Sequence, residues 1–489
     1  MRYRSQVMVV FIMALCMTII DGAMVNVALP KMAEDFDVAS TDIEWIAVGY
    51  LLSFASVIPA SGWLGDRFGT RRVFIAALGA FVTLSILCGL AQTLPQLVVL
   101  RILQGAGGGM LTPIGSAMLY RAFPLAERAK AAIGVLSVAV VAPAVGPLLG
   151  GALVDLASWH WIFLINGPVG AVAIGLSVLW LREEVQDEPG RFDGLGFVLS
   201  IVSVGTLLYA LSTAPERGWG SPATLGLLVA GLAAGAALIY VETHRPQPML
   251  ALRLFRDRLF RTINLAAATI YAGFFGMIFV LPLYMQTLRG YSAFESGLAQ
   301  APQALGIFLL SNLAGKRLYQ AIGPRRLMMW GALATALITC SYALADLSTP
   351  LATIAFISLL RGLAVGPLFV SIQTGVYATT SNVDTGRATS LFNTQRQVSY
   401  AAGVAMAATV VSALLADVGG DTAPAIDRLP AYQWGFIACG VVMIPAIFVS
   451  WFIHDDDVAA TRGPAVSGSD LGASGHDRTP KPPGARQVA

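Results

Sequence analysis

Long apolar runs, each separated from the next by a short polar stretch, fill nearly all of residues 7–453. A helix that crosses a bilayer needs about 20 mostly apolar residues, and fourteen runs meet that length. They are 7–29, 44–63, 73–92, 96–119, 130–153, 161–181, 194–213, 222–241, 262–286, 296–314, 327–345, 350–376, 388–414 and 432–453. Backbone groups in lipid must be hydrogen-bonded within their own segment, and the runs are too long for barrel strands. The sequence therefore predicts an all-α integral membrane protein.

The composition excludes a water-soluble protein of this size. Charged residues make up only 12% of the chain, whereas soluble domains carry about 25%. The net charge of +3 is too small to indicate a nucleic-acid partner. All four cysteines lie inside apolar runs and none is spaced like a metal ligand, so we expect neither a disulfide framework nor a metal site.

The basic residues gather on one side of the predicted spans. With the N-terminus placed inside, 24 of the 31 Lys and Arg residues lie inside, as the positive-inside rule requires. One missed span would invert the rest of the pattern, so it predicts an even number of spans with both termini cytoplasmic. The first run imitates a signal peptide, but it is too long and contains Asp21, so we expect an uncleaved span.

Two similar stretches indicate an internal repeat. Residues 100–109 and 360–367 each place an arginine, Arg101 or Arg361, near the start of a span and follow it with small residues. If the seventh and eighth spans are set aside, six remain on either side, as in transporters built from two repeated halves. The predicted units are a six-helix bundle over 1–185, two additional helices over 186–245, a second six-helix bundle over 246–454 and a disordered cytoplasmic tail over 455–489.

The loop at residues 62–72 carries the most specific motif. It combines close-packing glycines with Asp66 and Arg67, and it resembles the signature between the second and third spans of the major facilitator superfamily. The resemblance implies charge pairs that close the cytoplasmic side in the outward-facing state. The alternative is a loop that only sets topology through its arginines. The residues predicted to form this cytoplasmic latch are Gly62, Gly65, Asp66, Arg67, Gly69, Arg71 and Arg72.

Asp21 is the clearest carboxylate inside a predicted span. Residues 21–30 resemble the first-span signature of the fourteen-span drug:proton antiporters (EmrB/QacA-like efflux transporters), with Ala23 where that family has a hydroxyl residue. Removing a carboxylate from water disfavours its charged form, and an intramembrane acid is a functional hypothesis by default. The resemblance implies that Asp21 carries the proton and that Arg101 assists it. The alternatives are a structural acid and an arginine that snorkels to the interface.

The fifth predicted span resembles the antiporter signature of the superfamily over residues 134–151. Gly146, Gly150 and Gly151 give a smooth face for close packing, and Pro147 bends the helix. Importers of the superfamily generally lack this motif, so it favours export. The alternative is generic packing of small residues.

Several polar and aromatic side chains lie on spans that line the cavity in this family. An apolar cavity with few polar anchors suits large amphipathic compounds. The alternative is that these side chains belong to the core or face lipid. The substrate-cavity candidates are Asn26, Tyr50, Phe54, Tyr271, Phe274, Phe275, Asn393 and Gln397.

The motifs together predict a major facilitator fold of two pseudo-symmetric six-helix bundles plus two additional helices. The resemblance implies a proton-coupled multidrug exporter that works by alternating access. We expect no cofactor beyond the proton gradient, no enzymatic activity, and a monomer whose partners are protons, small hydrophobic substrates and the lipid bilayer. Abundant Ala, Gly and Arg indicate a bacterial source, and hence the inner membrane. Open alternatives are a periplasmic adaptor, export of one natural product, lipid or siderophore, proton-coupled import, and a membrane receptor or enzyme.

Overall fold

A computed structural model describes residues 3–38, 43–183, 193–245, 248, 250–313, 318–381, 383–419 and 423–454. Every regular element in these residues is helical, which confirms the predicted all-α fold. The predicted tail, 455–489, lies outside the described residues.

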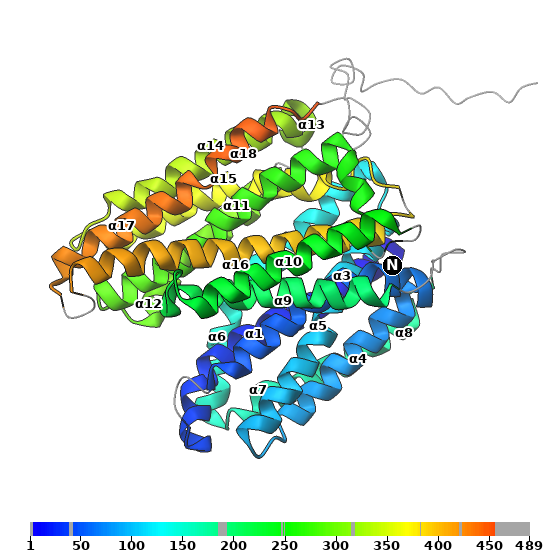
Figure 1. Ribbon diagram of the computed structural model, residues 1–489, viewed down its shortest axis with the longest axis horizontal. Helices are drawn as coiled ribbons and strands as arrows, with labels where there is room; N and C mark the ends of the chain where they lie inside the picture. The colour runs from blue at the N-terminus through cyan, green and yellow to red at the C-terminus, as the bar shows by residue number, and fades with distance from the viewer. Residues whose placement is uncertain are drawn as a thin grey trace, which may run out of the picture.

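The helices fall into two sets with a pair between them (Figure 1). The first set is α1 (Tyr3–Phe36), α3 (Trp45–Phe68), α4 (Thr70–Cys88), α5 (Leu94–Ala122), η1 (Leu125–Glu127), α6 (Arg128–Leu156), α7 (His160–Leu164) and α8 (Asn166–Trp180). The pair is α9 (Gly194–Arg217) and α10 (Pro222–His244). The second set is η2 (Leu252–Arg256), α11 (Arg258–Leu283), η3 (Tyr284–Leu288), α12 (Ala293–Leu313), α13 (Tyr319–Ile322), α14 (Pro324–Ser341), η5 (Tyr342–Leu344), α15 (Leu351–Gly375), α16 (Thr385–Asp417), α17 (Ala425–Val441) and α18 (Ile444–Ser450).

Twelve of the described helical segments are long and apolar enough to cross a membrane. The predicted fifth and tenth spans correspond to α6 and α12, which fall outside that set. In α6 the apolar residues form two shorter stretches, at 130–139 and 145–156. In α12 the polar side chains of Gln300, Gln303 and Asn312 interrupt the apolar sequence. Both segments are helical, but the count of fourteen spans stays a prediction.

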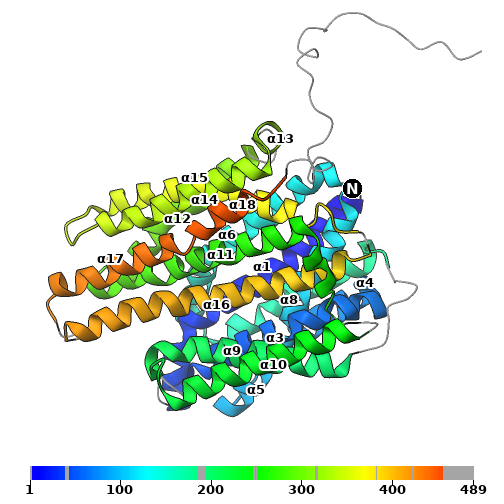
Figure 2. The ribbon, with the colours of Figure 1, turned by 45° about the horizontal axis from the view of Figure 1, so that its top comes forward.

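Packing within the two sets is equivalent, as the internal repeat predicts. Helix α5 packs on α3 and α4 in the first set, and α15 packs on α12 and α14 in the second. Helix α1 packs on α6 just as α11 packs on α16. The sets meet where α16 contacts α3 and α5, and where α6 contacts α12 and α15. Helices α9 and α10 run side by side (Figure 2), and α9 contacts both α3 and α16.

Both ends of the described chain lie toward one end of the bundle. Helix α1 begins there, and α18 runs back toward the same end (Figures 1 and 2). The charge pattern of the sequence assigns this end to the cytoplasm, so we call it the predicted cytoplasmic face. The opposite end is the predicted outer face.

Glycines set how closely the helices approach. A methyl group added at Gly109 of α5 would collide with the carbonyl oxygen of Phe54 in α3. Gly362 of α15 faces the carbonyl oxygen of Gln303 in α12 in the same way. Helices in lipid associate through such close packing, because apolar burial gives little driving force there.

Gly109→Ala is expected to destabilise the protein, since the added methyl group has no room against α3. Overpacking of this kind costs about 1–3 kcal/mol. The measurement is the thermal unfolding midpoint of the purified protein in detergent, which should fall by several degrees. Gly79→Ala in α4 is the matched control, because nothing lies within 4 Å of its added methyl group. Equal midpoints for the two variants would contradict the close contact between α3 and α5.

Candidate functional site

A buried ion pair joins α1 to α5. Arg101 Nη1 donates to Asp21 Oδ2 over 2.6 Å. The two side chains are 1% and 0% exposed, respectively. The structure thus brings together the two residues predicted to couple to protons, and Arg101 does not snorkel to an interface.

Two amides and a hydroxyl complete the site around Asp21. Gln104 and Asn166 donate to Asp21 Oδ1 over 3.3 and 2.9 Å. Gln104 also accepts from Arg101 Nη1 at 2.8 Å, and Asn166 donates to Ser85 Oγ at 3.0 Å. All five side chains are buried. They come from α1, α4, α5 and α8, and we call them the Asp21 network. An ionised carboxylate is an acceptor only, which matches its three donors.

Tyr50 of α3 covers the network. The guanidinium carbon of Arg101 lies 4.0 Å from the centre of the Tyr50 ring, a cation–π distance. The Tyr50 hydroxyl is buried and has no hydrogen-bond partner among the described residues. Phe54 lies next to it, with ring centres 5.9 Å apart. The exposed Asn26 lies outside this network.

The cavity candidates of the second half form a closed aromatic cluster. Phe369 packs against Tyr271 and Phe274 with ring centres 5.2 and 5.0 Å apart. Tyr271 and Phe274 are buried, and the partly exposed Phe275 packs beside them. Asn393 is buried too and donates to the carbonyl of Thr389 in its own helix, whereas Gln397 is half-buried.

Arg361 of α15 is the repeat copy of Arg101, and neutral groups hold it. Its Nη1 donates to Gln303 Oε1 at 2.7 Å, and its Nη2 donates to the carbonyl of Phe274 at 3.1 Å. Its Nε donates to Thr339 Oγ1 at 3.2 Å. In the described part of the chain this buried arginine forms no ion pair, so the acid–arginine couple belongs to the first half alone.

Asp66 joins the two halves at the predicted cytoplasmic face. Its Oδ1 lies 3.2 Å from Arg121 Nη2 of α5, and its Oδ2 lies 3.5 Å from Arg387 Nε of α16. Gly62 permits this approach, because a methyl group there would lie 3.0 Å from the carbonyl oxygen of Gly386. The sequence motif found Asp66 but gave no sign of either arginine partner.

Three further hydrogen bonds hold the halves together. Ser390 Oγ of α16 contacts the carbonyl oxygens of Ile58 and Pro59 in α3, at 2.7 and 2.9 Å. Arg128 Nη1 at the start of α6 donates to the carbonyl of Tyr377 over 2.6 Å. The halves are therefore closed against one another at this face.

Among the described residues, the other arginines of the predicted latch form no ion pair with Asp66. Arg67 is exposed and forms no ion pair among the described residues. Arg71 donates to the carbonyl of Val178, and Arg72 lies 3.5 Å from Glu183. Gly65 is buried in the last turns of α3. Gly69 joins α3 to α4 at a φ of 91°, where glycine is favoured.

The glycines of α6 face α1. A methyl group at Gly146 would collide with Ala23, and one at Gly150 would lie 2.9 Å from the Cα of Met24. Gly151 faces open space, and Pro147 lies inside the helix. The antiporter-like motif therefore sets the packing of α6 on the helix that carries Asp21.

Comparison with known proteins gives one consistent result. The profile of the Major Facilitator Superfamily matches residues 11–404, with a second match over 318–483. The uncharacterized MFS-type transporter YhcA of Bacillus subtilis is 31% identical over 82% of this chain and 76% of its own. A Serratia proteamaculans protein with the provisional name multidrug resistance protein MdtD is 32% identical over 88% of this chain and 90% of its own.

Solved structures share the fold. The human organic anion transporter MFSD10 superposes with a TM-score of 0.66 at 14% identity, over 91% of this chain and 99% of its own. The proton:xylose symporter XylE superposes with a TM-score of 0.61 at 15% identity, over 94% of this chain and 98% of its own. At these identities the likeness concerns the fold alone.

Arg101→Met is expected to destabilise the protein strongly, because it leaves the Asp21 carboxylate buried without its counter-charge. Breaking a buried pair from one side costs about 3–5 kcal/mol. Adding Asp21→Asn should recover much of the loss in thermal unfolding midpoint. Arg361→Met is the control, since it strands only neutral acceptors, and there Asp21→Asn should bring no recovery. If Asp21→Asn changed the unfolding midpoints of Arg101→Met and Arg361→Met by the same amount, the pairing would be refuted.

Asp66→Asn is expected to open the predicted cytoplasmic face, because it removes both ion pairs and leaves Arg121 and Arg387 to repel each other. Spin labels at the exposed positions Phe68 and Val383 report the distance between the halves. The open population should rise about tenfold, the change that ~1.4 kcal/mol produces. Arg67→Gln, at an exposed position, should leave the distances unchanged. An unaltered distribution in Asp66→Asn would show that these pairs do not hold the face closed.

Proposed function

Because the chain belongs to the major facilitator superfamily, we propose that it is a proton-coupled exporter of hydrophobic and amphipathic compounds that works by alternating access. The observation that carries the proposal is the buried couple of Asp21 and Arg101. An intramembrane acid held by a single arginine is a group that can exchange a proton for a change of conformation.

Protonation of Asp21 requires its network to rearrange. The carboxylate accepts from Arg101, Gln104 and Asn166, and a protonated acid keeps less acceptor capacity for them. Protonation of Asp21 also removes the negative charge that neutralises Arg101 deep in the bundle. Helices α1, α5 and α8 then lose the contacts that fix their present arrangement, so proton binding and helix movement are coupled.

In the proposed cycle, the closed contact around Asp66 belongs to the outward-facing state. A proton arriving from the outer face at Asp21 favours release of the compound to the outside. The deprotonated, inward-facing protein then binds the next molecule. Proton and compound drive the cycle only if they bind the two states with different affinities.

Direction and substrate class rest on separate observations. The multidrug resistance name of the Serratia relative supports export of foreign compounds, as does the packing motif of Gly146 and Gly150 on α1. The ring of Tyr50 and the aromatic cluster around Tyr271 suit apolar ring systems, and the unpaired Tyr50 hydroxyl offers one polar anchor. The proton gradient supplies the energy without a cofactor. The bacterial relatives support a place in the inner membrane.

Asp21→Asn is expected to abolish uphill export while the protein still inserts in the membrane. In everted vesicles, export appears as uptake of a lipophilic fluorescent dye added to the medium, and an uncoupler should collapse this uptake in the unaltered protein. The variant should retain exchange of dye between equal concentrations, because that exchange needs no proton. Asp155→Asn, at an exposed position on α6, is the control and should transport normally. Full proton-dependent export by Asp21→Asn would overturn the mechanism, and absence of uphill flux in the unaltered protein would overturn export itself.

A further inference from the structure

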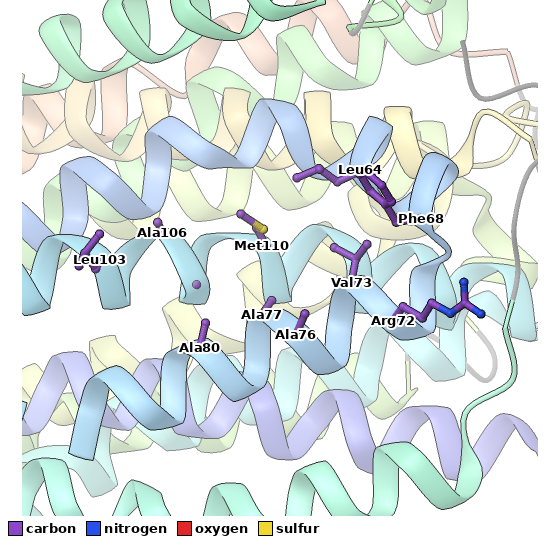
Figure 3. Close-up of a pocket in the computed structure, with 11 residues that line it drawn as sticks. Leu64, Phe68, Arg72, Val73, Ala76, Ala77, Ala80, Leu103, Ala106 and Met110 are labelled. Carbon is purple, nitrogen blue, oxygen red and sulfur yellow. The ribbon is translucent and has the colours of Figure 1, made fainter. Parts of the chain in front are cut away.

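A groove of about 610 Å³ lies on the outside of the first half, between α3, α4 and α5 (Figure 3). Its walls are almost wholly apolar, and small residues leave the space open: Ala76, Ala77 and Ala80 on α4, and Ala106 and Gly107 on α5. Larger side chains at these positions would fill it. The groove is therefore built from the choice of small residues on two neighbouring helices.

The groove opens toward the hydrocarbon of the bilayer. Phe68 and Leu103 on its rim are 51% and 50% exposed, and both belong to helices long and apolar enough to cross a membrane. Its lining residues on α5 recur at helical spacing, from Leu103 to Met110, and form one face of the helix. Arg101 and Gln104 lie on other faces of α5, so the groove is separate from the Asp21 network.

The length of the groove corresponds to one leaflet. From Arg72 to Ala80 along α4 it extends about 12 Å at 1.5 Å per residue, and the hydrocarbon core is about 30 Å thick. It begins at the predicted cytoplasmic face and ends near the middle of the bundle. A lipid acyl chain of the cytoplasmic leaflet matches the groove in polarity and length.

Arg72 gives the groove a charged mouth. Figure 3 shows its guanidinium reaching past the apolar lining at the end nearest the predicted cytoplasmic face. The side chain is 77% exposed, and its contact with Glu183 is a long one of 3.5 Å. Arg67 is exposed nearby and adds positive charge. A guanidinium at headgroup depth binds phosphate oxygens in a bidentate way, and basic groups beside spans select anionic lipids.

We propose that this groove binds an anionic phospholipid of the predicted cytoplasmic leaflet, with one acyl chain along α3, α4 and α5 and the phosphate on Arg72. The site gives Arg72 a role apart from the inter-half contact of Asp66. It also touches α3 at Leu64 and Phe68, on either side of Asp66. A bound lipid therefore braces the helix that carries the contact between the halves.

The test uses the full-length protein in detergent, titrated with phosphatidylglycerol or phosphatidylcholine and followed by native mass spectrometry. Phosphatidylglycerol should bind preferentially, and Arg72→Gln should weaken it about fivefold, the value of one basic residue against an anionic lipid. The matched control is Arg326→Gln, an exposed arginine at the equivalent position of α14 in the second half. It should bind the lipid as the unaltered protein does.

A second variant tests the groove without changing charge. Ala106→Leu fills the space between the helices and should weaken binding while Arg72 remains in place. Equal binding of both lipids, or equal losses in Arg72→Gln and Arg326→Gln, would overturn the proposal. So would an unchanged affinity in Ala106→Leu, or displacement of the lipid by inorganic phosphate alone. Thermal unfolding midpoints equal to that of the unaltered protein establish that each variant is folded.

Discussion

The ion pair between Asp21 and Arg101 is the interaction on which the first half depends. Neither charge could stay in the bundle alone, because an isolated ion in a low-dielectric interior carries a large desolvation penalty. Together they draw in Gln104, Asn166 and Ser85, so one charge pair fixes the positions of four helices. For the same reason, a change in the charge of Asp21 alters the hydrogen bonds of every helix that donates to the network.

Helix α5 connects this network to the contact between the halves. It carries Arg101 toward one end and Arg121 toward the other, about 30 Å apart at 1.5 Å per residue. Its middle is rich in glycine and contains Pro113, features at which helices bend. Because its glycines seat it tightly on α3, movement of α5 also displaces the helix that carries Asp66. Packed contacts with two discrete arrangements are the physical means by which distant sites are coupled.

The sequence was sufficient for features that depend on local pattern. Apolar runs located the helices, and the positions of Arg101 and Arg361 revealed the repeat. The sequence did not predict which side chains of different helices contact one another. Asn166 lies in the sixth predicted span and Gln104 in the stretch 100–109 that indicated the repeat, yet neither position told which way its side chain points. Arg121 and Arg387 lie far from Asp66 in sequence, so only the folded arrangement joins them. In α12, Gln303 likewise has its reason in a partner distant in sequence, because it accepts a hydrogen bond from the buried Arg361.

The second half keeps the arginine of the repeat and replaces its acid with neutral acceptors. Under the proposed exchange, the single couple of the first half carries one proton per cycle. One proton moving inward against a neutral compound moving outward transfers a net positive charge, so the membrane voltage assists, at about 2.3 kcal/mol per charge per 100 mV. An outgoing monovalent cation cancels that charge and leaves only the difference in pH to drive the cycle. Because only Arg101 keeps an acidic partner, the charge of the compound determines whether the membrane voltage or only the pH difference can drive its export.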